Sequence, residues 1–173
     1  MFSKQTYINR RRTLKEKVGS GTILIFGHNE SPSNYPGNTY MFRQDSSFAY
    51  YFGQQHEGLA GVIDIDNDTE YLIGNDTGID EAIWTGPVPS VRDLAEEVGI
   101  THTAPMSQLG HIIAASSHVN YLPPCRHDIM IQIGDLLGIH PLKVRDKASL
   151  PLIKAVIDMR TVKTDEEIAE IEK

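Results

Sequence analysis

Hydrophobic positions recur along the chain at two spacings, one typical of helices and one typical of strands. Ser3 is a favourable N-cap residue, and the spacing after it predicts a helix over residues 4–18 that Gly19 ends. Short apolar runs bounded by glycine or turn residues predict three strands, at residues 21–26, 59–65 and 69–73. A tight turn separates the last two runs, which therefore predict a β-hairpin.

The most aromatic stretch, FRQDSSFAYYFG at residues 42–53, is the one around which the rest of the chain is organised. Its apolar side chains run without interruption from Phe48 to Phe52, and Gly53 follows them. Aromatic residues favour strands, and both alternating sets of side chains are apolar. The stretch therefore predicts a strand inside a sheet that is covered on both faces. The long polar loop before it, residues 28–40, has a length typical of functional loops.

The second half of the chain interleaves helical and strand patterns. Ser90 and Asp93 form a capping pattern at the start of a helix that extends to about Val98. Three further helices and one strand are predicted, the helices at residues 107–115, 126–137 and 150–159 and the strand at 118–122. Strands that alternate with helices predict an α/β domain built on a mixed β-sheet.

Residues 164–173 carry a strong signal for the start of a helix. Thr164 and Glu167 form a capping box, and Ile168 and Ile171 provide an apolar stripe. So short a helix is marginal without tertiary packing. The pattern predicts that the chain is the first part of a longer protein and that this helix is its least stable one.

Composition and charge narrow the range of partners. The 173 residues suit one domain, and 40% hydrophobic with 23% charged residues is typical of globular proteins. A net charge of -7 argues against nucleic acid and anionic membranes as partners, and no apolar run approaches the length of a membrane span. The basic run Arg10-Arg11-Arg12 is interpreted as a solvated helix face. Cys125 is the only cysteine, so no internal disulfide can form, and a cytoplasmic location is favoured.

Residues able to carry out chemistry do not form a recognisable catalytic set. The seven histidines lack zinc-ligand spacing, no nucleotide-binding or serine-hydrolase motif is present, and Cys125 has no paired base. The hairpin turn at residues 64–68 begins like an EF-hand loop, but Thr69 and Asn75 occupy the positions that require Gly and Glu. The residues alone predict no catalytic residue and no metal ligand in this chain.

Four motifs in order nevertheless resemble one family. YINRR opens the chain, FRQDSSFAYYFG and then AIWTG at residues 82–86 follow it, and MRTVKTDEEIAEIEK ends it. Together they resemble the amino-terminal domain of Xaa-Pro aminopeptidases (aminopeptidase P) and of their relative prolidase. The resemblance implies a creatinase/prolidase amino-terminal fold, an α/β unit with a mixed β-sheet flanked by helices and a ribonuclease H-like motif. It implies this domain over residues 1–160, and over 161–173 a junction with the first helix of a catalytic domain.

The resemblance also implies a function that depends on that catalytic domain. In the family, a "pita-bread" domain binds two divalent metal ions, usually manganese, through two Asp, one His and two Glu, and this chain lacks it. Trp84 matches the tryptophan of the family's WxG motif, which in several relatives lines the substrate cleft of a neighbouring subunit. An ordinary packed or half-exposed tryptophan is the alternative. The implied partners are proline-containing peptides, the protein's own catalytic domain and further copies of the same chain.

Two classes of function remain open at this point. The first is the non-catalytic domain of a metal-dependent Xaa-Pro aminopeptidase, which removes an N-terminal residue that precedes proline, or of an Xaa-Pro dipeptidase (prolidase). The second is a stand-alone module that binds peptides or proteins. The capped helix that begins at Thr164 favours the first class. In both cases we expect this chain alone to bind no catalytic metal and to hydrolyse no peptide.

Overall fold

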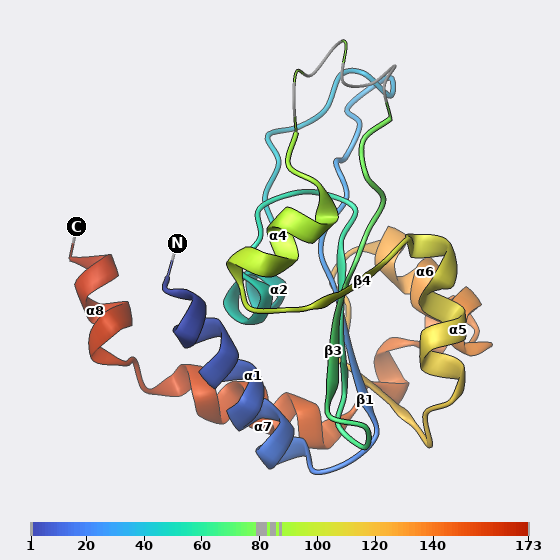
Figure 1. Cartoon of the computed structure of the whole chain (residues 1–173). Helices are drawn as coiled ribbons and strands as arrows, with labels where there is room; N and C mark the ends of the chain where they lie inside the picture. Colours follow the sequence, from blue (N-terminus) through green and yellow to red (C-terminus); the bar gives the residue numbers. More distant parts are fainter. Residues whose placement is uncertain (1, 79–82, 84–85, 87, 173) are drawn as a thin grey trace.

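The computed structural model describes residues 2–78, 83, 86 and 88–172, and a mixed five-stranded sheet in the order β4-β3-β2-β1-β5 lies at its centre (Figure 1). The strands are β1 (Thr22–Phe26), β2 (Ala60–Asp64), β3 (Thr69–Ile73), β4 (His102–Ala104) and β5 (Val119–Tyr121). Antiparallel pairing joins β1 to β2 and β2 to β3, whereas β5 pairs in parallel with β1 and β4 in parallel with β3. The predicted α/β class and mixed sheet are confirmed.

Helices cover both faces of this sheet (Figure 1). One face carries α1 (Lys4–Val18), α2 (Ser46–Phe52), α4 (Val91–Glu97) and α7 (Leu150–Thr161). The other face carries α5 (Leu109–Ala114) and α6 (His127–Leu137), and α8 (Asp165–Ile171) follows α7 and lies beside the start of α1. Short 3₁₀ turns occupy Met106–Gln108, Pro141–Lys143 and Arg145–Lys147. In the part of the chain that the structure describes, no helix is long and apolar enough to cross a membrane.

The continuous apolar run of β1 is explained by its central position. Ile23 and Ile25 belong to the hydrophobic cluster beneath α1, α2, α4 and α7, whereas Leu24 and Phe26 belong to the cluster beneath α5 and α6. Side chains of a strand point alternately to opposite faces, so a strand covered on both sides carries apolar side chains on both faces.

The aromatic stretch is a helix, so the strand predicted over residues 42–53 is wrong. Asp45 is the N-cap of α2, and its Oδ1 accepts hydrogen bonds from two backbone N–H groups of the first turn, both at 2.9 Å. Gly53 ends the helix in the left-handed conformation, with φ of 68°. Capping at both ends outweighs the strand preference of aromatic residues, which is more dependent on context than helix propensity.

The burial pattern of α2 has the helical period. Phe48, Tyr51 and Phe52 have no exposed surface, whereas Tyr50 between them is half-buried. Phe52 lies over Gly61 of β2, where a Cβ atom would stand 2.0 Å from the ring carbon Cζ. The close contact between α2 and the sheet therefore depends on the absence of a side chain at Gly61.

Most other predicted elements are confirmed within a few residues. Ser3 caps α1 and Gly19 ends it, and Ser90 and Asp93 form the capping box of α4. The hairpin of β2 and β3 has the predicted turn. The helix predicted at residues 107–115 is divided into a 3₁₀ turn and α5. The sequence pattern does not predict strand β4, because this strand is only three residues long and lies mostly exposed at the edge of the sheet.

The interpretation of Arg10-Arg11-Arg12 as a solvated helix face is wrong for two of the three residues. Arg10 is 7% exposed and Arg11 is 0% exposed, and only Arg12 points to solvent. Buried arginine requires partners for its charge and its N–H groups. Both buried arginines have them, from segments distant in the sequence.

Candidate functional site

Trp84, the residue for which the family resemblance implies substrate contact, lies outside the described residues. Side-chain hydrogen bonds hold the described chain on both sides of it. Oδ1 of Asp76 accepts from the backbone N of Val91 (2.7 Å), and Oδ1 of Asn75 accepts from the backbone N of Met106 (3.0 Å). These bonds fix the point where the chain leaves β3 and the point where it enters α4.

A cleft with a volume of about 330 Å³ lies beside these points. Polar and apolar side chains from three segments line it, among them His56, Glu57, Leu59, Asp76, Val91 and Leu94. The Nδ1 atom of His56 is buried and has no hydrogen-bond partner among the described residues. A mixed polar and apolar lining suits a small ligand or a peptide side chain.

The amide of Gln44 connects the loops at this end of the sheet. It is 6% exposed. Its Oε1 accepts from the backbone N of His28 (2.7 Å) and of Asp45 (2.9 Å), and its Nε2 donates to the backbone O of His56 (2.8 Å). Figure 1 shows the loop at residues 28–40 extending from the same end of the sheet as the chain that follows β3. The loop predicted to be functional is thus joined to the segment that lines the cleft.

Titratable groups at this end are engaged in structure and do not form an acid–base pair. Of the described residues, His28 and Asp45 alone place a histidine nitrogen near a carboxylate, with Nε2 and Oδ2 3.8 Å apart. Nδ1 of His28 donates to the backbone O of Arg43 (2.8 Å), and Asp45 begins α2. In the described ranges, no group of three or more His, Cys, Asp or Glu side chains could hold a metal ion. These residues do not fit the two-metal centre that the family resemblance implies for the catalytic domain.

Arg126 and Asp128 form a paired contact at the start of α6. Nε and Nη2 of Arg126 each donate to one carboxylate oxygen of Asp128 at 3.0 Å, and Nη1 donates to the backbone O of Asn29 (2.8 Å). Burial by itself raises the pKa of Asp128, but the hydrogen bonds and charge of Arg126 outweigh it, so the pKa lies below its usual value. This pair holds the start of loop 28–40 against α6.

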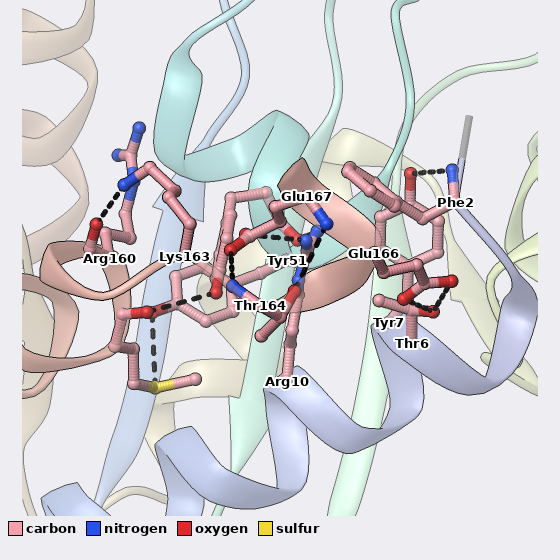
Figure 2. Close-up of polar contacts among 12 residues, drawn as sticks. Phe2, Thr6, Tyr7, Arg10, Tyr51, Arg160, Lys163, Thr164, Glu166 and Glu167 are labelled. Carbon is pink, nitrogen blue, oxygen red and sulfur yellow. Dashed lines mark hydrogen bonds and ion pairs between the residues drawn. The ribbon is translucent and has the colours of Figure 1, made fainter. Parts of the chain in front are cut away.

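A second polar cluster joins α8 to the domain, and Figure 2 shows its members. Nη2 of Arg10 donates to Oε1 of Glu167 at 2.9 Å, and the Glu167 side chain is 9% exposed. Oγ1 of Thr6 lies 2.9 and 2.7 Å from the two carboxylate oxygens of Glu166. We call Thr6, Arg10, Glu166 and Glu167 the α8 junction.

Finding this junction requires both the start of α8 and the contact between Arg10 and Glu167, and the sequence indicates only the first. The capping box marks Glu167 as an N3 residue, which the structure confirms, but it does not mark Glu167 as buried. Arg10 and Glu167 are 157 positions apart, and neither periodicity nor spacing relates residues at that distance. Only the fold brings them together.

Comparison with known proteins identifies the family of residues 7–120 of this chain. The family model "Aminopeptidase P, N-terminal domain" matches residues 7–120. Human Xaa-Pro dipeptidase is 25% identical over 114 residues, which are 62% of this chain and 23% of that protein. The resemblance inferred from the sequence motifs is confirmed.

Two solved structures have the same fold. Aminopeptidase P from Escherichia coli in its low-pH form has a TM-score of 0.80 and 21% identity over 98% of this chain and 41% of that one. The zinc-substituted E. coli aminopeptidase P in complex with product has a TM-score of 0.77 and 21% identity over 97% and 41%. The chain thus spans well under half the length of the proteins it matches.

Proposed function

This chain belongs to the aminopeptidase P N-terminal domain family, and from that premise we propose that it is the non-catalytic amino-terminal domain of a metal-dependent Xaa-Pro aminopeptidase. The catalytic domain of that protein would remove an N-terminal residue that precedes proline. The observation that carries the proposal is the family match over residues 7–120, which extends from α1 into β5.

In this proposal the domain limits access to the catalytic centre. The cleft beside Asp76 and the loop held by Gln44 would form one wall of the substrate site, and Trp84 would contribute to the same wall. The metal ions, manganese in our proposal, would bind to the catalytic domain. The domain itself would cover residues 1–160, with residues 161–173 as the junction, and it would also contact other copies of the protein.

A dipeptidase is the second candidate, and the match to human Xaa-Pro dipeptidase favours it. The two activities differ in the length of substrate they accept. A dipeptidase requires a wall that closes the site after the proline, whereas an aminopeptidase leaves room for the residues that follow.

The test is to assay the protein encoded by the complete gene with manganese, using Xaa-Pro dipeptides and Xaa-Pro peptides of three or more residues. We expect release of the first residue from the longer peptides. Hydrolysis of dipeptides alone would favour the dipeptidase. Peptide binding without any hydrolysis would reject both enzymes in favour of a binding module. The 173-residue chain, assayed in parallel, is expected to be inactive.

A further inference from the structure

The guanidinium of Arg10 contacts three segments at once. Nη1 donates to the backbone O of Tyr50 at the end of α2 (3.0 Å), and Nη2 donates to Glu167 of α8 (2.9 Å). Its carbon Cζ lies 3.8 Å from the centre of the Tyr50 ring and 4.4 Å from that of Phe2, so the guanidinium lies over two aromatic rings. These contacts hold the Arg10 side chain in one orientation, in which its Nη2 group points towards α8.

Glu167 uses both of its carboxylate oxygens. Oε2 accepts from the backbone N of Thr164 (2.9 Å) and closes the capping box, while Oε1 accepts from Arg10. One side chain thus determines where α8 begins and where it attaches to the domain. Because the pair is buried, loss of one partner leaves a charge without compensation.

The rest of α8 is more exposed. Ile168 is 42% exposed and Ile171 is 71% exposed, and the bonds between Thr6 and Glu166 lie at the surface. Exposed hydrogen bonds and ion pairs contribute little to stability in water. Of the contacts described above, the pair of Arg10 and Glu167 is the buried one, and it contributes most to the direction of α8 relative to the sheet.

We propose that Arg10 is the positioning residue that sets the direction in which α8 leaves this domain, and with it the placement of the polypeptide that follows. Arg10 also donates to the backbone of α2. The N-cap of that helix, Asp45, donates its backbone N–H to the Gln44 side chain, which also bonds the loops around the cleft. The same guanidinium thereby connects α8 to the wall of the cleft. The consequence for catalysis rests on the proposed function, whereas the direction of α8 does not.

The direction of α8 can be measured with two spin labels in this chain. Cys125 is exposed and is the only cysteine, so an Ala169→Cys variant carries one label beside α6 and one on α8. The distance distribution is compared in this background and after Arg10→Gln, Glu167→Gln and Glu166→Gln. Glutamine at position 167 can still close the capping box, so that variant removes the charge paired with Arg10 and keeps the helix start.

We expect a single narrow distribution for the parent and for Glu166→Gln, which is the matched control. Arg10→Gln and Glu167→Gln should broaden it, and amide exchange in α8 should become at least about tenfold faster while β1 and β2 remain protected. In the variant that carries both Arg10→Gln and Glu167→Gln, the distance distribution should be no broader than in either single variant, because the two residues act through their contact with each other.

A distribution as narrow in Arg10→Gln and Glu167→Gln as in the parent would overturn the proposal. If Arg10→Gln lowers protection in β1 and β2 as well, Glu167→Gln alone decides, since it leaves the core contacts of Arg10 in place. Equal broadening by Glu166→Gln would also reject the assignment to Arg10. None of these measurements needs peptidase activity, so their failure and a failure of the proposed function are separate results.

Discussion

At the scale of single residues, Arg11 has the largest fully buried side chain in the part of the chain that the structure describes. It donates to the backbone O of Tyr51 (3.0 Å) and of Val98 (2.8 Å), and its Nε donates to Glu70 (2.7 Å). Tyr51 lies in the last turn of α2, and Val98 is the C-cap of α4. Carbonyl groups at helix C-termini lack intrahelical partners and attract positive charge, so one buried cation stabilises the ends of two helices.

Arg11→Met should therefore lower the free energy of unfolding by about 3–5 kcal/mol, because it leaves the two buried carbonyl groups without their donor and leaves Glu70 with Lys15 as its remaining ion-pair partner. Arg12→Met, one position further along α1 and exposed, is the matched control and should change it by less than about 0.5 kcal/mol. Urea unfolding followed by circular dichroism measures both values. Similar small losses in the two variants would contradict the role assigned to Arg11.

The pair of Arg126 and Asp128 predicts a dependence on pH. The pKa of Asp128 is lowered in the folded protein, so the pair contributes stability above the ordinary pKa of an aspartate, about 3.9, and loses it as pH falls below that value. The parent should lose more stability between pH 6 and pH 3 than Asp128→Asn does. Unfolding free energies at a series of pH values test this, and parallel curves for the two proteins would refute it.

At the scale of elements, α2 depends on its N-cap. Asp45→Ala removes the acceptor of two backbone N–H groups and should cost about 1 kcal/mol of stability. Asp45→Asn keeps an acceptor oxygen in the same place, and asparagine is an equally good N-cap. This variant should therefore lower the stability by only about a few tenths of a kcal/mol. Chemical unfolding of the two variants separates capping from charge. A large loss in Asp45→Asn would assign the effect to the carboxylate beside His28 instead.

The packing of α2 on the sheet gives a second prediction at this scale. Gly61→Ala places a methyl group 2.0 Å from Phe52 Cζ, so the ring must move, and we expect a loss of about 1–3 kcal/mol. Gly110→Ala is the control, since its Cβ would meet Leu136 at an ordinary 3.6 Å and alanine favours helices. A thermal melt in which both variants match the parent would show that α2 has room to shift.

The helices and strands also show how much of the fold can be predicted from the sequence. Helices with a clear cap and period, such as α1 and α4, could be predicted, as could β1 and the hairpin. The run from Phe48 to Phe52 could not, because five apolar residues in a row fit a strand and a helix equally well. Asp45 and Gly53 decide in favour of the helix, because they cap its two ends. Their capping geometry cannot be read from the composition of the stretch. The α8 junction depends on contacts between the two ends of the chain, which only the fold provides.

At the scale of the whole molecule, the loop end of the sheet and α8 form separate surfaces. Figure 1 shows α8 beside the start of α1, away from the loops that follow β1 and β3. Arg10 contacts both α2 and α8. In the proposed peptidase, this arrangement would let the domain hold a catalytic domain through α8 while its loops restrict the peptide that enters.

The last prediction concerns Trp84 in the complete protein and rests on the proposed function. A tryptophan that forms part of the substrate wall provides a large, rigid face, and its removal should weaken binding of the transition state. Trp84→Ala should lower kcat/KM for Xaa-Pro peptides by an amount equivalent to about 1–3 kcal/mol, with bound metal and melting temperature unchanged. Trp84→Phe keeps an aromatic face and should recover part of the loss. If Trp84 instead packs inside its own domain, Trp84→Ala will lower the melting temperature of the 173-residue chain itself, and that outcome would reject the substrate role in favour of a structural one.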